Sequence, residues 1–215
     1  MYKTNPVEKF PSELTEMFDS PVFIASGSTS MVFKAYFKDD KVYADRPMAV
    51  KIPIKLDDGY SLKDFYNEVA AVSSGQHPNI AGYHRYFLKP RTCIVMDYAK
   101  GRPLSVIGYN MADDDLKGVI KDMSRVWISL HARGYVLGSV SLDDILVRKV
   151  AKRSSDAEGN LISRRAYRST LVDLGGLKDL RSDAISSLER EKLRAADLVR
   201  FASLCGRIRK LGKRF

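Results

Sequence analysis

Apolar and polar residues alternate along three stretches near the start of the chain, Val22–Ser26, Met31–Phe37 and Met48–Ile52. Side chains of a β-strand point alternately to its two faces, so a period of two predicts a strand at each stretch. Gly27–Ser30 and the Asp39–Asp40 pair supply turn residues between the strands. The pattern therefore predicts strands joined by tight turns.

The apolar period then lengthens from two to three or four. Phe65, Val69 and Val72 recur at this spacing, which predicts a helix that ends at about Ser74. After the His77–Ile80 break, the period returns to two. Two further strands are predicted at Tyr83–Leu88 and Cys93–Asp97. Five strands and one helix form a first lobe at residues 22–98, and the proline-containing residues 1–21 form a leader.

Residues 99–215 are predicted to form a second, mainly helical lobe. Leu116, Met123 and Leu130 belong to the apolar stripe of a long amphipathic helix that ends near Gly134. Short strands are expected at 145–147 and 169–172, with a flexible, polar hairpin insertion at 149–168 between them. A last helix is expected from about residue 186 to residue 211. We expect an α+β fold with two lobes.

The net charge of +10 is concentrated in the last third of the chain. Residues 1–144 hold 18 basic and 18 acidic groups, whereas residues 145–215 hold 18 basic groups and 8 acidic ones. Two interpretations follow: a solvated helix face with a basic tail, or a patch for an acidic protein, a nucleic acid or a membrane surface.

The last helix carries both an apolar and a basic pattern. We expect its apolar residues to face the lobe core and its basic residues to bind a partner. The predicted core stripe comprises Leu198, Phe201, Ala202, Cys205 and Ile208, and the basic stripe comprises Arg194, Arg200, Arg207, Arg209 and Lys210.

The sequence contains few features that indicate a cellular compartment. No apolar run reaches the length of about 18 residues that suits a membrane span, and the first residues lack a signal-peptide pattern. Cys93 and Cys205 lack metal-ligand spacing, so we expect two buried free thiols in a reducing compartment. These features predict a cytoplasmic protein.

Five motifs follow one another in a fixed order. They are the stretch Ile24–Ala35 around Gly27, the strand Ala49-Val-Lys-Ile52, the helix residue Glu68, the strand and turn Cys93–Leu104, and Leu171-Val-Asp-Leu-Gly175. Between the last two lies the segment Tyr135–Val147, with the length and apolar frame of a kinase catalytic loop.

Together these motifs resemble the protein-kinase superfamily, from about Val22 to Gly175 and again at Asp197–Cys205. The resemblance implies a two-lobed kinase-like fold, with a five-stranded N-lobe carrying one helix and a shortened, mainly helical C-lobe. It also implies ATP and Mg²⁺ as ligands. In such a fold Asp197 would brace the catalytic loop.

The resemblance also implies a role for each motif residue. Lys51 would contact the nucleotide phosphates while paired with Glu68, and Asp173 and Asp144 would bind Mg²⁺. Met96 would be the gatekeeper, beside a hinge from Asp97 to Ala99. The nucleotide-binding residues implied are Gly27, Val32, Ala49, Lys51, Glu68, Met96, Asp97, Ala99, Leu146 and Asp173. Val72, Leu137 and Leu174 would form an apolar stack.

The catalytic loop departs from the family pattern at its reactive positions. Ser139 replaces the catalytic Asp, and a hydroxyl cannot accept or orient a proton as a carboxylate does. Gly138 replaces the loop Arg, Ser141 replaces the loop lysine and Asp144 replaces the metal-binding Asn. No Ala-Pro-Glu follows Gly175, and the sequence stops before the family's remaining C-lobe helices.

Three functions fit these residues. The first is a pseudokinase that binds ATP and acts through another protein, such as a kinase or kinase regulator, in the host cytosol if it is an effector. The second is a minimal atypical Ser/Thr kinase in which Asp143 or Asp144 replaces the lost Asp. The third is a basic nucleic-acid-binding protein, although the sequence holds no basic motif interleaved with aromatic residues.

Overall fold

The computed structural model describes residues 9–27, 29–43, 45–54, 62–155 and 161–212, with the backbone alone for 62–63, 152–155 and 161–165. The chain divides into two compact units, one of residues 1–73 with 82–98 and one of residues 74–81 with 99–215. Cys93 and Cys205 are both buried and free, as predicted. None of the helices in the described ranges is both long and apolar enough to cross a membrane.

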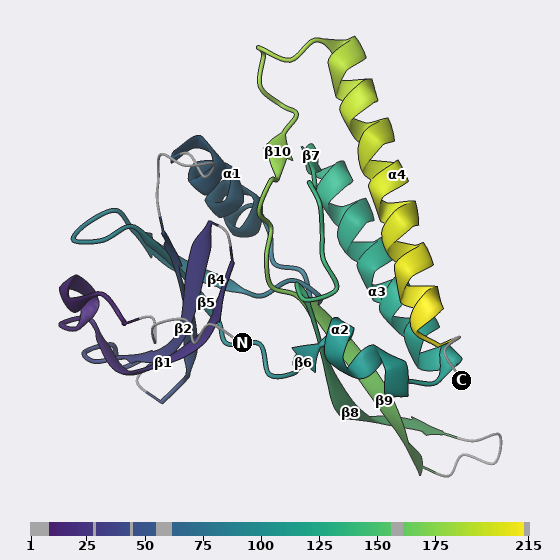
Figure 1. Ribbon diagram of the computed structural model, residues 1–215, viewed down its shortest axis with the longest axis horizontal. Helices are drawn as coiled ribbons and strands as arrows, with labels where there is room; N and C mark the ends of the chain where they lie inside the picture. Colours follow the sequence, from purple (N-terminus) through teal and green to yellow (C-terminus); the bar gives the residue numbers. More distant parts are fainter. Residues whose placement is uncertain (1–8, 28, 44, 55–61, 156–160, 213–215) are drawn as a thin grey trace, which may run out of the picture. The chain divides into compact units, whose positions relative to one another are not determined.

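The first unit is built on one antiparallel sheet of five strands in the order β1-β2-β3-β5-β4 (Figure 1). All five strands predicted from the alternating pattern are present, and β1 begins four residues earlier than predicted. The strands are β1 (Phe18–Ser26), β2 (Ser30–Phe37), β3 (Met48–Pro53), β4 (Tyr83–Phe87) and β5 (Cys93–Asp97).

Two apolar clusters stabilise this unit. One face of the sheet buries Phe33 and Val50 together with Leu14 and Phe18, which lie in the segment that we predicted to be a leader. Leu14 belongs to a short 3-10 helix, η1 (Ser12–Leu14). The second cluster places α1 (Leu62–Ser73) against the sheet, because its Phe65 and Val69 pack with Ile94 and Met96 of β5.

The second unit is built around two long helices, α3 (Asp113–Ala132) and α4 (Ser187–Leu211). Trp127 of α3 and Phe201 of α4 stack with ring centroids 4.7 Å apart. Shorter elements are β6 (Arg102–Pro103), α2 (Leu104–Ile107), η2 (Gly108–Asn110), β7 (Tyr135–Val136) and β10 (Lys178–Asp179).

The residues at the ends of both long helices explain where these helices begin or end. α3 begins with three aspartates in its first turn, where negative charge stabilises a helix N-terminus. It ends before Gly134, whose φ of +82° suits glycine better than a residue with a side chain. The Ser186 hydroxyl caps α4 by accepting a hydrogen bond from the Glu189 N–H at 3.2 Å.

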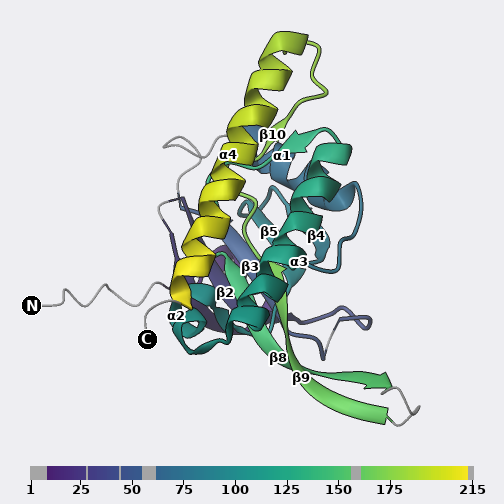
Figure 2. The same cartoon turned by 90° about the vertical axis from the view of Figure 1, so that its right-hand side faces the viewer.

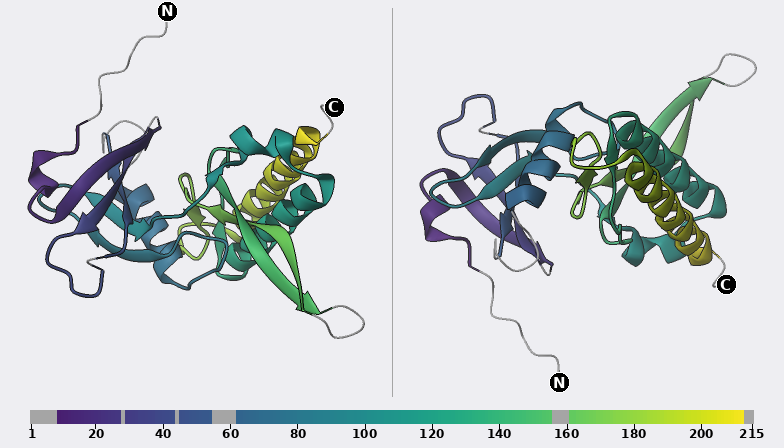
Figure 3. Two further views of the ribbon diagram at one scale, coloured as in Figure 1. Left: turned by 90° about the horizontal axis from the view of Figure 1, so that it is seen from below. Right: turned by 90° about the horizontal axis from the view of Figure 1, so that it is seen from above.

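The predicted hairpin insertion is a long regular ribbon. β8 (Ile145–Ser155) and β9 (Leu161–Leu171) pair antiparallel in unbroken register over eleven residues each. In Figures 2 and 3 the ribbon runs from its base beside α3 away from the two long helices of this unit. The predicted tip of the hairpin, residues 156–160, lies outside the described residues.

One prediction for α4 is wrong. Leu198 is 55% exposed and Ala202 is also exposed, so neither belongs to the core stripe. The buried face instead runs through Asp197, Leu204, Cys205, Ile208 and Leu211. The error arises because α4 carries apolar residues on both sides, including Val199, which is 70% exposed.

Candidate functional site

In the first unit, Lys51 and Glu68 form the ion pair that the sequence predicted. The Lys51 ammonium donates to both carboxylate oxygens of Glu68, at 2.9 and 3.0 Å, and the two residues are only 4% and 2% exposed. A buried charge without its partner is strongly disfavoured, so each residue holds the other in place. The pair therefore presents a fixed cation on the sheet.

The helix and the sheet each supply one half of this pair. Phe65 and Val69, which flank Glu68 on α1, are buried against β5, and this packing aims Glu68 at the sheet. Lys51 lies in the middle of β3, with Val32 opposite it on β2 and Ile94 opposite it on β5.

The other predicted residues of this unit lie on neighbouring strands. Val32 and Ala49 are half-buried, and Ala49 is opposite the buried Met96 in the register of β3 and β5. The Asp97 N–H donates to the Gly82 carbonyl at 2.7 Å, and its carboxylate lies 2.8 Å from His84 Nε2. The backbone N–H and the carboxylate of Asp97 therefore both have hydrogen-bond partners within the first unit.

Gly27 follows β1, and its N–H donates to the Ser30 carbonyl at 2.8 Å. A Cβ added at Gly27 would lie 3.8 Å from that oxygen, which is an ordinary van der Waals distance. The backbone at this turn therefore does not itself require glycine. The neighbouring residue 28 lies outside the described residues.

In the second unit, a buried carboxylate holds the start of the loop that resembles a catalytic loop. Asp197 Oδ2 accepts a hydrogen bond from the Leu137 N–H at 3.1 Å, as the resemblance implied. The same oxygen lies 2.8 Å from Nε2 of His131 on α3, a contact that sequence reasoning missed. Burial raises the pKa of Asp197, whereas its hydrogen bonds with His131 and Leu137 oppose that rise.

Gly138, which the resemblance places at the loop Arg, is packed against another backbone segment. A Cβ at Gly138 would lie 2.9 Å from the Gly176 carbonyl oxygen, closer than real Cβ atoms come to backbone atoms. Gly176 itself has φ of +75°, which favours glycine. The loop and the segment after Asp173 therefore meet at two glycines, and no larger residue fits at 138 without a backbone shift.

The reactive positions of the loop hold hydroxyls and two unlike carboxylates. Ser139 is exposed, and the Ser141 hydroxyl accepts from the N–H groups of Asp143 and Asp144 at 3.1 and 3.2 Å. The Asp143 carboxylate accepts a hydrogen bond from the Ser105 hydroxyl of α2. Asp144 instead turns back and accepts from the Ser141 N–H at 2.7 Å.

Asp144 and Asp173 lie near enough for their charges to interact. The Val172 N–H donates to the Asp144 carbonyl at 3.0 Å, and Asp173 Oδ1 accepts from the Gly175 N–H at 2.7 Å. Burial raises the pKa of Asp144, and the negative charges of Asp173 and Asp143 raise it further. A cation near these carboxylates would relieve that repulsion.

A metal site at this point would be incomplete without further ligands. Across the described part of the chain, no three His, Cys, Asp or Glu residues gather as a metal-binding group. Mg²⁺ commonly takes one or two carboxylates plus phosphate oxygens and water, so two aspartates suit a phosphate-bound Mg²⁺.

Leu146, Ala99 and the residues of the predicted apolar stack are divided between the two units. Leu146 is half-buried on β8, opposite Pro103 and Thr170, and Ala99 is half-buried at the start of the second unit's main segment. Leu137 and Leu174 are buried in the second unit, and Val72 is buried in the first.

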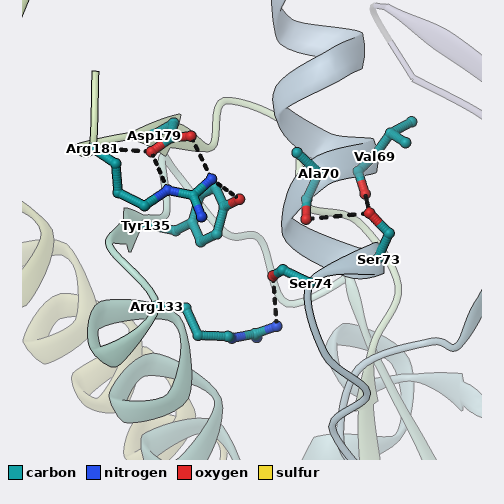
Figure 4. Close-up of polar contacts among 8 residues, drawn as sticks. All are labelled: Val69, Ala70, Ser73, Ser74, Arg133, Tyr135, Asp179 and Arg181. Carbon is teal, nitrogen blue, oxygen red and sulfur yellow. Dashed lines mark hydrogen bonds and ion pairs between the residues drawn. The ribbon is translucent and has the colours of Figure 1, made fainter. Parts of the chain in front are cut away.

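The segment after Gly176 is tied to β7. β10 pairs antiparallel with β7, and the Leu180 N–H donates to the Gly134 carbonyl at 2.8 Å. Arg181 binds both carboxylate oxygens of Asp179 and donates to the Tyr135 hydroxyl (Figure 4). Hydrogen bonding by Arg181 lowers the pKa of Asp179. The segment after Gly176 is therefore held by the β10–β7 pairing and by the contacts of Arg181.

Arg207 was predicted to belong to a stripe for partner binding. Its guanidinium instead donates to the Val140 carbonyl at 2.7 Å, so this arginine supports the loop from α4. Neither this bond nor the approach of Gly138 to Gly176 leaves a periodic signal in the sequence, because both depend on how distant backbone segments meet.

No protein-family model matches the chain. Ankyrin repeat-containing protein kinase A of Dictyostelium discoideum is 32% identical over 75 residues, which cover 35% of this chain and 5% of that protein. The chain therefore matches about a twentieth of the length of this curated relative.

A solved structure matches far more of the chain. The crystal structure of the kinase domain of PF14_0431 has a TM-score of 0.59 and 17% identity, and the match covers 82% of this chain and 56% of that one. At this identity the likeness concerns the fold. The chain therefore has a mixed α+β, kinase-like fold, with a small lobe built on a five-stranded antiparallel sheet and a mainly helical lobe.

Proposed function

We propose that this protein is a degenerate member of the protein-kinase superfamily, a cytoplasmic pseudokinase that binds Mg²⁺-ATP and acts by binding another protein. Its N-lobe comprises residues 22–98, its mainly helical C-lobe residues 99–215, and residues 1–21 lead into the N-lobe. The observation that carries the proposal is the buried Lys51–Glu68 ion pair, retained in a chain whose catalytic Asp position holds Ser139.

The retained pair supports nucleotide binding. Burying two charges costs several kcal/mol of solvation free energy per ion, as an order of magnitude, so a buried pair is a poor choice for stability alone. A phosphate-binding lysine, however, needs a partner that fixes its orientation. Lys51, with both Glu68 oxygens within 3.0 Å, meets that need.

The carboxylates of the second unit support the magnesium part of the proposal. Asp173 and Asp144 would hold Mg²⁺, with nucleotide phosphates completing its coordination. Bound magnesium would neutralise phosphate charge. Asp144 is partly buried and repelled by Asp173, so its carboxylate gains more from a neighbouring cation than an exposed one would.

The loop chemistry supports the loss of phosphoryl transfer. Ser139 offers no carboxylate to orient a hydroxyl nucleophile, and Ser141 offers no cation for the transferring group. Gly138 cannot be replaced by an arginine without displacing Gly176. Three neighbouring positions have thus lost their usual chemistry together, which favours a binding role over slow catalysis.

One observation favours a second candidate, a minimal atypical kinase that uses Asp144. Burial raises the pKa of Asp144, and a base works best when its pKa approaches the working pH. Asp143 is the weaker substitute, because its carboxylate already accepts from Ser105.

Thermal unfolding with and without nucleotide tests the proposal. At a hundredfold excess over Kd, a ligand stabilises the folded state by about 2.7 kcal/mol. We expect Mg²⁺-ATP to raise Tm and expect the shift to be lost in Asp173→Asn, with Asp183→Asn as an exposed acidic control. No shift at millimolar Mg²⁺-ATP would contradict nucleotide binding.

A further inference from the structure

The β8–β9 ribbon concentrates positive charge in a way that nothing in the kinase-like machinery explains. Its two strands hold seven basic residues and no acidic residue: Arg148, Lys149, Lys152, Arg153, Arg164, Arg165 and Arg168. The connecting residues 156–160 add Asp156 and Glu158, so residues 145–171 carry +5, half of the net charge of +10.

The backbone register pairs basic residues of one strand with basic residues of the other. Arg148 pairs with Arg168, and Lys152 pairs with Arg164. Like charges at facing positions destabilise a sheet, so this arrangement costs folding free energy that a bound polyanion would recover. Arg168 donates a hydrogen bond to the Pro78 carbonyl at 2.7 Å, and Arg148 and Lys149 are exposed at the base of the ribbon.

The basic positions occur in both alternating sets of the ribbon. Because strand positions alternate between two faces, residues 148, 152, 164 and 168 belong to one set and residues 149, 153 and 165 to the other. A membrane surface or an acidic peptide would contact the basic residues of only one set. A nucleic-acid groove has a phosphate backbone on either side and can meet both.

We propose that the β8–β9 ribbon binds duplex DNA by entering the major groove. That groove is about 12 Å wide and admits a two-stranded β-ribbon. The major groove of an RNA duplex is too narrow for such an entry, so DNA is the better fit. The proposal stands independently of nucleotide binding, because it uses no residue assigned to ATP or Mg²⁺.

The affinity for duplex DNA should depend steeply on salt. Each neutralised phosphate contributes about −0.9 to the slope of log affinity against log salt concentration, so seven contacts give about −6. Fluorescence anisotropy of the full chain with a labelled DNA duplex of mixed sequence, between about 50 and about 200 mM salt, measures this slope.

Two variants with equal charge loss test the location. The ribbon variant carries Lys152→Gln, Arg153→Gln, Arg164→Gln and Arg165→Gln, and its slope should flatten by about 3.6. The control variant carries Lys192→Gln, Arg194→Gln, Arg200→Gln and Arg209→Gln, all exposed on α4, and should keep most of the slope. Circular dichroism checks that both fold. Should the ribbon variant misfold, Arg148→Gln with Lys149→Gln replaces it, with an expected flattening of about 1.8.

Several results would overturn the proposal. One is equal flattening in the ribbon and α4 variants, which would indicate general charge attraction. Another is the absence of binding to the duplex at about 50 mM salt. Tighter binding to an RNA duplex, to phosphatidylserine vesicles or to a polyglutamate peptide would assign the ribbon to that partner instead.

Discussion

Gly138 and Gly176 approach so closely that a Cβ on Gly138 would come within 2.9 Å of the Gly176 carbonyl oxygen. The contact joins the loop that resembles a catalytic loop to the segment that follows Asp173. Glycine is therefore required at position 138 for a steric reason, because a side chain there would displace backbone atoms of the facing segment.

We predict that Gly138→Ala lowers the free energy of unfolding by about 1–3 kcal/mol, because the methyl group must displace backbone atoms. Gly118→Ala is the matched control. Gly118 lies in α3, and nothing lies within 4 Å of a Cβ at that position, so alanine should raise stability by up to about 1 kcal/mol. Urea denaturation measures both changes, and a Gly138→Ala protein as stable as the wild type would contradict the clash.

The Lys51–Glu68 pair makes a second prediction. Lys51→Met or Glu68→Leu alone should cost about 3–5 kcal/mol, because each leaves one buried charge unpaired. The double variant should recover most of that loss, since two apolar side chains replace the pair. The exposed Lys117–Asp114 pair, 2.8 Å apart, is the control, and its coupling should be far weaker because water screens both charges.

A double-mutant cycle on urea denaturation measures both couplings. The double variant should at the same time lose the thermal shift with Mg²⁺-ATP, which separates the function of the pair from its stability. A double variant as unstable as the worse single variant would indicate that the packing of α1, and not the charge pair, dominates.

Asp144 and Asp179 should give stability a pH dependence of opposite sign. The pKa of Asp144 is raised on folding, so the folded state holds its proton more tightly than the unfolded state. Its contribution to stability is present at low pH and is lost as pH rises from its ordinary value of 3.8 through the raised folded pKa. The pKa of Asp179 is lowered, so its contribution is present above 3.8 and is lost as pH falls through the lowered folded pKa.

Denaturation from about pH 3 to pH 7 checks both signs. The stability of the wild type relative to Asp144→Asn should fall as pH rises, whereas its stability relative to Asp179→Asn should rise. The asparagine at 144 keeps an oxygen that can accept from the Ser141 N–H, so the comparison isolates the charge. Parallel pH profiles for the two variants would refute the assigned directions.

The features predicted correctly are those that produce a local periodicity or a short motif in the sequence. The five strands, the long helix that ends before Gly134 and the Lys51–Glu68 pair each follow from spacing or motif order. The length of the β8–β9 ribbon was underestimated, because polar residues interrupt the apolar pattern along its two strands. The core stripe of α4 was predicted wrongly because apolar residues line two sides of the helix, and packing against α3, β7 and η2 selects the buried side.

The last prediction concerns catalysis. With Ser139 and Ser141 in place of an acid and a lysine, we expect transfer from radiolabelled ATP to generic protein substrates to stay well below the usual kinase range of about 1–100 s⁻¹. An Asp173-dependent rate within that range would replace the pseudokinase with an atypical kinase. In that event Asp144→Ala should abolish transfer and Asp143→Ala should leave most of it, because Ser105 already occupies the Asp143 carboxylate whereas Asp144 lies beside Asp173. The reverse order would identify Asp143 as the base and would require its bond with Ser105 to open before substrate binds.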